Sequence, residues 1–242
     1  MIIITWNVNH RAVEKKIPPL MADALASLNP DVIVLTEFVP GKSRDKFFTD
    51  LNSHGYVHTR MSSFTPKENH LLIASRHFLN DGNIKAPPIA PSVPSNALHV
   101  YLPTQNINIL GLRIPDYSKK PFIKRKCWEW ILETTEKVKE SPFIFLGDFN
   151  TDPNYTKVRC GDRFNILIKQ GWQNATPSEG ASYWSPIGNG VRIDHAFTSN
   201  HLLIKKTQFI KQSGQYVFVG KDPEALSDHA ILMVDLEHRT YN

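Results

Sequence analysis

One segment of the chain joins an apolar strand to two polar side chains that could do chemistry. The run Phe143-Ile144-Phe145-Leu146-Gly147 leads directly into Asp148-Phe149-Asn150. Because side chains alternate along an extended backbone, Asp148 and Asn150 are expected on the same side of the emerging chain. Their hard oxygen atoms suit a hydrated metal ion, and the amide N–H can hold charge that develops on a phosphoryl oxygen.

Polar side chains also follow other predicted strands. A strand at 2–6 leads into Asn7, and the β-branched run at 32–35 leads into Thr36 and Glu37. Taken singly, each has an ordinary structural explanation: Asn7 could start a turn, and Glu37 could be solvent-exposed. Ligands in layered α/β folds gather beyond the carboxyl ends of strands, so the shared position favours one common site. The side chains in this set are Asn7, Glu37, Asp148, Asn150, Asp194, Asp228 and His229.

The elements that position these residues follow from the apolar periodicity. Helices are predicted over 18–28, 121–139 and 163–170, and an irregular surface loop over the proline-rich stretch 81–96. Strands are predicted at 2–6, 32–35, 71–75, 97–102, 107–113, 143–146, 191–198, 207–219 and 229–236. Many strands with few helices indicate two packed mixed sheets flanked by helices, a four-layer α/β/β/α sandwich of the α/β class. No low-complexity linker divides the chain, so residues 1–242 are expected to form a single domain.

Composition narrows the class of protein. The 242 residues are 41% hydrophobic, which is enough for a sizeable core, and the net charge of +5 mildly favours an anionic partner. No apolar stretch approaches the roughly 20 residues that span a bilayer, and the first residues do not form a signal peptide. Cys127 and Cys160 have no metal-ligand spacing and are expected to be free thiols. We therefore expect a cytoplasmic monomer that does not bind membranes.

The ordered set of motifs resembles the endonuclease/exonuclease/phosphatase superfamily. That group includes abasic-site endonucleases, exonuclease III, pancreatic deoxyribonuclease, neutral sphingomyelinases and inositol polyphosphate 5-phosphatases. The resemblance runs from residue 3 to about residue 236 and implies a metal-dependent phosphohydrolase with the four-layer fold. The matching motifs are Trp6-Asn7, Thr36-Glu37, Gly147-Asp148-Phe149-Asn150, Arg192-Ile193-Asp194-His195 and Ser227-Asp228-His229.

The resemblance also implies a role for each site residue. Glu37 would be the principal ligand of Mg²⁺ or Mn²⁺, with Asn7 beside it and Asp228 nearby or at a second metal position. The catalytic residues would be Asp148, Asn150, Asp194 and His229. Asp148 would position or deprotonate the attacking water, and Asn150 would stabilise charge on the phosphoryl oxygens. His229, oriented by Asp194, would contact the scissile phosphate and transfer a proton.

One motif departs from the superfamily pattern. Arg113 stands where abasic endonucleases usually have tyrosine and other branches have histidine, and Asp116 stands where abasic enzymes usually have asparagine. Arginine can grip a phosphate through two donors but cannot act as a general acid at neutral pH. Val191 replaces the aromatic residue that usually lines the lesion pocket. These departures weaken an abasic-site assignment and make Arg113 and Asp116 candidates for substrate phosphate binding.

Basic residues follow this motif and extend into the next predicted helix. They are either a solvated helix face or a track for the phosphate backbone of a nucleic acid, and the second interpretation predicts salt-sensitive binding. The residues assigned to phosphate binding are Lys119, Lys120, Lys124 and Arg125, beside Lys126. Tyr117 and Trp184 are candidates for stacking on bases, although for Trp184 packing under a loop is the favoured interpretation. Trp6 and His195 each neighbour a site residue in the sequence and should face the opposite side of the sheet, so both are expected to pack.

The resemblance implies a Mg²⁺-dependent phosphodiester hydrolase that uses in-line attack of water. The excess of basic over acidic residues favours DNA as its substrate, cut as an endonuclease or exonuclease. An alternative is a phosphatase or phosphodiesterase for an inositol phosphate, a phospholipid or a nucleotide. A second alternative is a catalytically silent nucleic-acid-binding module. It is disfavoured because every metal and proton-transfer position of the superfamily pattern is filled.

Overall fold

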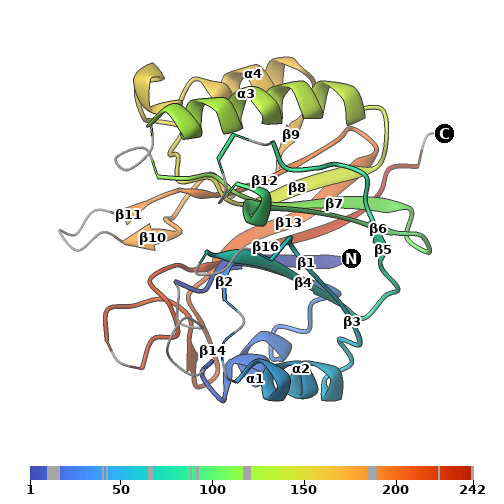
Figure 1. Cartoon of the computed structure of the whole chain (residues 1–242), viewed down its shortest axis with the longest axis vertical. Helices are drawn as coiled ribbons and strands as arrows, with labels where there is room; N and C mark the ends of the chain where they lie inside the picture. Colours follow the sequence, from blue (N-terminus) through green and yellow to red (C-terminus); the bar gives the residue numbers. More distant parts are fainter. Residues whose placement is uncertain are drawn as a thin grey trace.

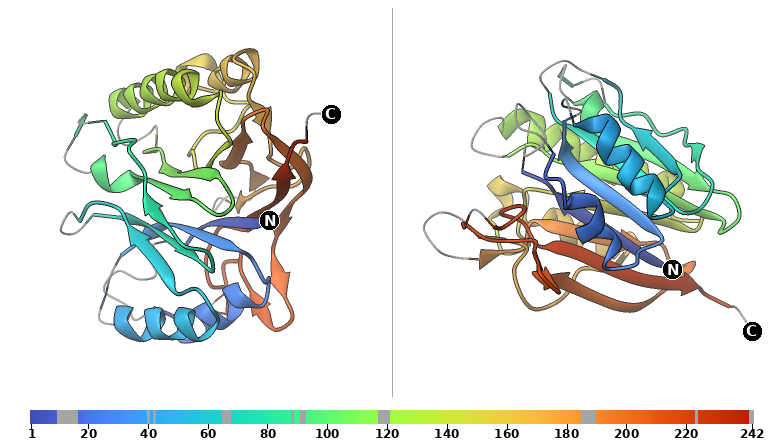
Figure 2. Two further views of the ribbon diagram at one scale, coloured as in Figure 1. Left: turned by 90° about the vertical axis from the view of Figure 1, so that its right-hand side faces the viewer. Right: turned by 90° about the horizontal axis from the view of Figure 1, so that it is seen from below.

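The computed structural model describes residues 1–9, 17–39, 41, 43–64, 68–87, 89–90, 93–116, 121–184, 190–222 and 224–240. Two mixed sheets of six strands pack face to face, and a pair of helices covers each outer face (Figures 1 and 2). Helices α1 (Met21–Ala26) and α2 (Arg44–Ser53) lie on one side, and α3 (Pro121–Val138) and α4 (Arg163–Lys169) lie on the other. The predicted four-layer α/β/β/α sandwich is confirmed.

The two sheets divide the chain between them. The first has the order β13 (Leu202–Ile210), β16 (Ile231–His238), β1 (Ile2–Asn7), β2 (Val32–Phe38), β4 (His70–Ser75) and β3 (His58–Met61). The second has the order β5 (Asn80–Asp81), β6 (Ala97–Leu102), β7 (Ile107–Arg113), β8 (Phe143–Asp148), β12 (Asp194–Thr198) and β9 (Gln173–Asn174). Two small ribbons pair β10 (Tyr183–Trp184) with β11 (Gly190–Val191), and β14 (Gln212–Ser213) with β15 (Tyr216–Val217). Two 3₁₀ turns, η1 (Pro94–Asn96) and η2 (Lys157–Arg159), complete the elements.

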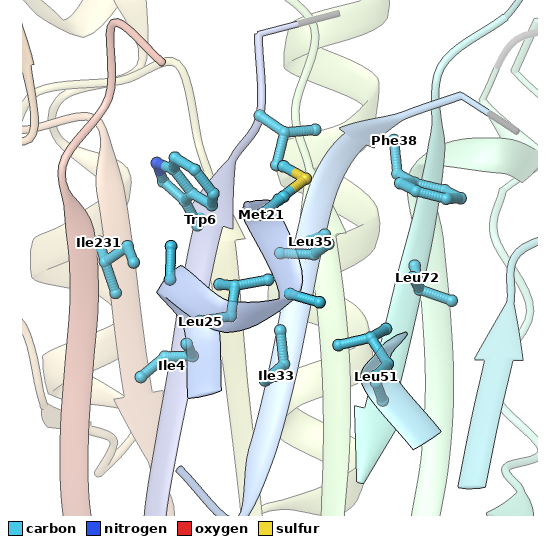
Figure 3. Close-up of a cluster of buried hydrophobic side chains, with 14 of the residues drawn as sticks. Ile4, Trp6, Met21, Leu25, Ile33, Leu35, Phe38, Leu51, Leu72 and Ile231 are labelled. Carbon is cyan, nitrogen blue, oxygen red and sulfur yellow. The ribbon is translucent and has the colours of Figure 1, made fainter. Parts of the chain in front are cut away.

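Alternating side chains on each central strand fill two cores at once. On β1, Ile4 and Trp6 face α1 and α2, whereas Ile3 faces the interior between the sheets. Figure 3 shows Ile4, Trp6, Ile33 and Leu35 meeting Met21 and Leu25 of α1. On β8, Ile144 faces the same interior and Phe145 faces the helices α3 and α4. Continuous apolar strands are what a sheet covered on both faces requires.

The strand directions bring the chemical residues to one edge. β1 runs parallel to β2, and β7 runs parallel to β8. Hydrogen bonds from Asn7 to Asp148 and from Arg113 to Glu37 show that the ends of all four strands lie together at this edge. β12 runs antiparallel to β8 and begins there, with Asp194 opposite Asp148 in the register. β16 runs antiparallel to β1, so the segment that precedes β16 also lies there.

Several element boundaries differ from those predicted. The first helix begins only at Met21, after the proline pair at 18–19, and the last long strand begins at Ile231. The predicted strand 207–219 is divided between β13 and the β14–β15 ribbon. Helix α2 was not predicted, because it buries only Phe47 and Leu51 and so has a weak apolar stripe. No helix in the described part of the chain is long and apolar enough to cross a membrane.

Candidate active site

A cleft of about 500 Å³ opens at the shared edge of the two sheets. In Figure 1 this edge carries the β10–β11 ribbon and the beginning of α3. The cleft is lined by Asn7, Asn9, Glu37, Arg113, Asp116, Asp148, Asn150, Tyr155, Arg159, Tyr183, Val191, Ile193, Asp228 and His229. Its lining therefore includes most of the side chains that the sequence placed at strand ends.

The Asp148 carboxylate is held by amides from both sheets. Oδ2 of Asp148 accepts hydrogen bonds from Nδ2 of Asn7 and Nδ2 of Asn150, both at 2.9 Å. Oδ1 accepts the backbone N–H of Asn150 at 2.8 Å. The second amide hydrogen of Asn150 goes to the carbonyl of Ile114 at 2.8 Å. Three donors fix the carboxylate in one orientation before any ligand enters.

The turn that produces this arrangement depends on Gly147. Its φ of +147° is a conformation that residues with a side chain rarely adopt. A Cβ atom placed on Gly147 would lie 1.9 Å from the carbonyl oxygen of Leu112 on the neighbouring strand. Asn150 is itself left-handed, with φ of +48°, a conformation that asparagine tolerates better than most residues. Glycine is therefore needed for β7 and β8 to approach closely just before Asp148.

Glu37 reaches the cleft through an irregularity in β2. The register of β2 against β4 shifts between Leu35 and Phe38, and Glu37 has a left-handed φ of +56°. Its Oε1 accepts two hydrogen bonds from Arg113, from Nε at 2.9 Å and from Nη2 at 2.5 Å. The pair links the two sheets and is largely buried, with 9% of the Glu37 side chain and 17% of the Arg113 side chain exposed.

His229 lines the cleft and forms a buried pair with Asp194. Nδ1 of His229 lies 2.8 Å from Oδ2 of Asp194, and because an ionised carboxylate only accepts, Nδ1 carries the hydrogen. Ser182 fixes the start of β12, since its Oγ accepts the N–H groups of Ile193 and Asp194, both at 3.0 Å. The ring of Tyr183 lies 4.9 Å from the ring of His229. These contacts hold the imidazole in place. Its other ring nitrogen, Nε2, lies 3.9 Å from Oδ1 of Asp228.

Burial and crowded charges shape the electrostatics of the cleft. Burial and the charge of Asp194 raise the pKa of Asp148, although His229 and Arg113 oppose this. Burial also raises the pKa of Asp228. Burial alone would lower the pKa of His229, but the charge and hydrogen bond of Asp194 outweigh it and raise that pKa. The cleft thus concentrates carboxylates that a cation would stabilise.

A family model described as the Endonuclease/Exonuclease/phosphatase family matches residues 4–229. The chain belongs to the endonuclease/exonuclease/phosphatase family. It is accordingly a phosphoric ester hydrolase, and the resemblance inferred from the strand-end motifs is confirmed. A comparison with curated proteins found no match.

Several solved structures share the fold of this chain over nearly its whole length. An endonuclease/exonuclease/phosphatase from Beutenbergia cavernae DSM 12333 has a TM-score of 0.75 at 16% identity, covering 98% of this chain and 71% of that one. The 3' phosphatase NExo from Neisseria, bound to product DNA hairpin, has a TM-score of 0.73 at 19% identity, covering 98% and 99%. An AP endonuclease from Archaeoglobus fulgidus has a TM-score of 0.73 at 16% identity, covering 97% and 98%. At these identities the likeness concerns the fold.

The basic residues predicted to bind phosphate do not share one surface. Lys124 is fully buried, and its Nζ donates to the carbonyl of Asn150 at 2.6 Å, so its assignment to an exposed phosphate track is wrong. Arg125 is exposed on α3 and is not among the residues that line the cleft. Asp116 lines the cleft, and Arg113 is bound to Glu37. The predictions for Lys119, Lys120 and Tyr117 concern residues outside the described part of the chain.

The packing predictions for Trp6 and His195 are confirmed. Trp6 is buried in the core under α1, and its Nε1 donates to the carbonyl of His229 at 2.8 Å. His195 is buried, with its ring 4.5 Å from that of Phe164. Trp184 is half-buried below the ammonium of Lys211, which lies 4.6 Å from the ring centroid.

Several residues of the site were not predicted from the sequence, and four of them are the most informative. Tyr155, Arg159 and Tyr183 line the cleft, and Ser182 holds the backbone before Asp194. Tyr155 and Arg159 lie in a loop with no apolar period, so nothing in the local pattern marked them. Ser182 and Tyr183 adjoin Trp184, and the aromatic pair in an otherwise polar stretch was the available signal.

Proposed function

We propose that the chain is a divalent-metal-dependent phosphodiesterase that hydrolyses DNA. One observation carries the proposal: the fixed carboxylate of Asp148 faces the same cleft as the His229–Asp194 pair. Hydrolysis of a phosphodiester needs a group that takes a proton from water and a group that supplies one to the departing oxygen. A carboxylate and an imidazole on one cleft meet both needs.

The residues present fit a magnesium or manganese ion. Among the described residues, no cluster of three or more His, Cys, Asp or Glu side chains could enclose a metal by itself. That agrees with Mg²⁺, which usually takes one or two carboxylates and completes its shell with water and substrate phosphate. Glu37, Asp228 and the amide oxygen of Asn7 would hold the ion. When bound, it would neutralise charge on the phosphoryl oxygens.

The residues of the chain divide the reaction between them. Asp148 orients a water molecule and takes its proton as the water oxygen bonds to phosphorus. His229 binds the phosphate and gives a proton to the departing oxygen as the phosphorus–oxygen bond breaks. Asp194 keeps the imidazole in the required orientation. Both amide hydrogens of Asn150 are directed at protein acceptors, so we assign Asn150 to positioning Asp148 in place of direct charge stabilisation.

Charge and structural relatives support DNA as the substrate. The net charge is +5, and Arg113 and Arg159 line the cleft beside the acidic groups. Structures with the same fold include a 3' phosphatase bound to a DNA hairpin and an AP endonuclease. Val191 contributes a small side chain to the cleft, which favours phosphodiester hydrolysis over recognition of an abasic lesion. We further propose that residues 1–242 act as one domain and as a monomer in the cytoplasm.

Cleavage of plasmid and oligonucleotide DNA tests the proposal. The wild-type protein should cut DNA with Mg²⁺ or Mn²⁺ and stop when EDTA is added. Glu37→Ala and His229→Ala should lose at least about 100-fold in kcat, whereas Glu133→Ala, on the exposed face of α3, should not. Hydrolysis of bis(p-nitrophenyl) phosphate without DNA cleavage would show instead that the substrate is a small phosphate ester. Full activity of both site variants would reject the assigned residues.

A further inference from the structure

Beyond Asp148, the wall of the cleft is formed by Tyr155 and Arg159. The guanidinium carbon of Arg159 lies 3.7 Å from the centroid of the Tyr155 ring, and both side chains line the cleft. At this distance the planar guanidinium stacks on the ring, which fixes its plane and leaves its N–H groups directed outward from the edge. Arg159 itself is exposed.

The loop that carries this pair is anchored at several points. Oδ1 of Asp152 accepts the N–H of Asn154, and Oδ2 accepts the N–H of Arg192, both at 2.8 Å. The N–H of Tyr155 donates to the carbonyl of Asp152 at 2.9 Å. Gly161 packs so closely that a Cβ on it would lie 1.9 Å from the Tyr155 carbonyl oxygen. A ligand that binds Arg159 therefore does not have to order this loop first.

Arg159 and Arg113 both line the cleft but differ in their charged partners, since Arg113 is paired with Glu37. Within the part of the chain that the structure describes, no carboxylate forms an ion pair with the guanidinium of Arg159. Glu37 and Asp228, the carboxylates proposed to hold the metal, line the same cleft as Arg159. The cleft thus combines carboxylates suited to a metal ion with a guanidinium suited to an anion.

The cleft volume of about 500 Å³ exceeds what a single phosphate needs and is in the range of sites that enclose a nucleotide-sized ligand. We propose that Arg159, stacked on Tyr155, binds the phosphate adjacent to the scissile one in a polynucleotide. The inference rests on the proposed function and deepens it, because it defines the substrate as a chain with at least two phosphates. Stacking of a base on the covered face of Tyr155 is excluded while Arg159 occupies that face.

Binding measured apart from cleavage tests this subsite. Fluorescence anisotropy of a labelled single-stranded oligonucleotide would be followed in the Glu37→Ala background with Mg²⁺ present. Adding Arg159→Ala should weaken binding about tenfold and lower the slope of log affinity against log salt by about one. Lys157→Ala is the matched control, because Lys157 is exposed on the same 3₁₀ turn and is not among the cleft-lining residues. It should change affinity less than twofold. In the same Glu37→Ala background, Tyr155→Phe keeps the ring and should leave the affinity for the oligonucleotide unchanged. Tyr155→Ala removes the ring and should lower this affinity.

Turnover then separates this subsite from the scissile phosphate. With an active protein, Arg159→Ala should raise KM for the oligonucleotide more than it lowers kcat. The loss in kcat/KM should be at least tenfold larger for the oligonucleotide than for bis(p-nitrophenyl) phosphate, which has one phosphate. Equal losses on the two substrates would place Arg159 at the scissile phosphate and overturn the proposal, as would an equal effect of Lys157→Ala on binding. Arg159-dependent binding of DNA that the protein does not cleave would reject the proposed function and the position of the subsite beside a scissile phosphate, but would retain Arg159 as a phosphate-binding residue.

Discussion

Arg113 donates two hydrogen bonds to a single oxygen of Glu37, across the gap between the two sheets. Glu37 is the carboxylate proposed to hold the metal, so the arginine and the metal act on the same group. The guanidinium also lies near Asp148 and Asp116, whose charges help to raise the pKa of Arg113 against the effect of burial. Arg113 is thus a fixed cation among carboxylates, which differs from the free phosphate clamp expected from the sequence.

Replacing Arg113 should therefore make stability depend more strongly on divalent metal. Arg113→Met leaves the buried Glu37 carboxylate without its cation, which typically costs about 3–5 kcal/mol. A bound metal ion can compensate part of that charge, so Mg²⁺ or Mn²⁺ should raise the melting temperature of Arg113→Met by more than that of the wild type. Differential scanning fluorimetry with and without metal measures this.

Arg60 provides the control for this prediction. It forms an ion pair with Asp81 in which both side chains are substantially exposed. Arg60→Met should cost less than about 1 kcal/mol and should not alter the response to metal. An identical metal-induced shift in Arg113→Met and in the wild type would contradict a shared role of Arg113 and the metal at Glu37.

Gly147→Ala should disrupt both the fold and the site. The added methyl group would meet the Leu112 carbonyl oxygen at 1.9 Å, and the residue would have to keep a φ of +147°. We expect the free energy of unfolding to fall by about 3 kcal/mol or more, measured by urea denaturation.

Gly55→Ala is the control: Gly55 also has a positive φ, but nothing lies within 4 Å of its Cβ position. Its cost should be only about 1 kcal/mol, and similar losses in the two variants would show that strain alone explains the effect.

The strand-end residues could be found from the sequence because buried strands produce a recognisable apolar run that stops where the polar residue begins. The β1 and β8 runs predicted the edge at which Asn7 and Asp148 meet, and the parallel pairing of their neighbours brought Glu37 there as well. The partner of Arg113 could not be predicted. It depends on the register shift in β2, which turns Glu37 toward the other sheet.

The burial of Lys124 was predictable in part. It lies four residues before Trp128 and seven before Ile131, so it shares the apolar stripe of α3 with them. Membership of a basic cluster suggested an exposed face, but helical phase was the better guide. The position of Arg159 had no such signal, because a loop fixed by backbone hydrogen bonds has no periodic sequence pattern.

Acid should destabilise the protein through buried neutral histidines, above all His195. Burial lowers the pKa of His195 to about 4, from an ordinary value near 6.5. Between these two values the unfolded chain binds a proton that the folded chain does not, so the free energy of unfolding falls as pH decreases from 6.5 to 4. The contribution of His195 amounts to about 3 kcal/mol over this range.

Urea denaturation of the wild type and of His195→Gln at pH 7, 6, 5 and 4.5 measures the effect. The variant should lose less stability than the wild type between pH 7 and pH 4.5, whatever its stability at pH 7. The free energy of unfolding of the variant should still depend on pH, because burial also lowers the pKa of His70 and of His99. Parallel curves for the two proteins would show that His195 does not control the acid response.

Lys124 should affect turnover without contacting substrate. Its Nζ holds the carbonyl of Asn150, the residue whose left-handed backbone and side chain position Asp148. Lys124→Met keeps most of the packing on α3 but removes this hydrogen bond. We expect kcat to fall about 10- to 100-fold, because a displaced carboxylate no longer aligns the water, while KM changes little.

Lys126→Met is the matched control on the same helix, where Lys126 forms an exposed ion pair with Glu129 at 2.8 Å. Lys126→Met should leave kcat within twofold of the wild-type value. A Lys124→Met protein that melts normally and turns over at the wild-type rate would show that Asn150 and Asp148 do not depend on Lys124.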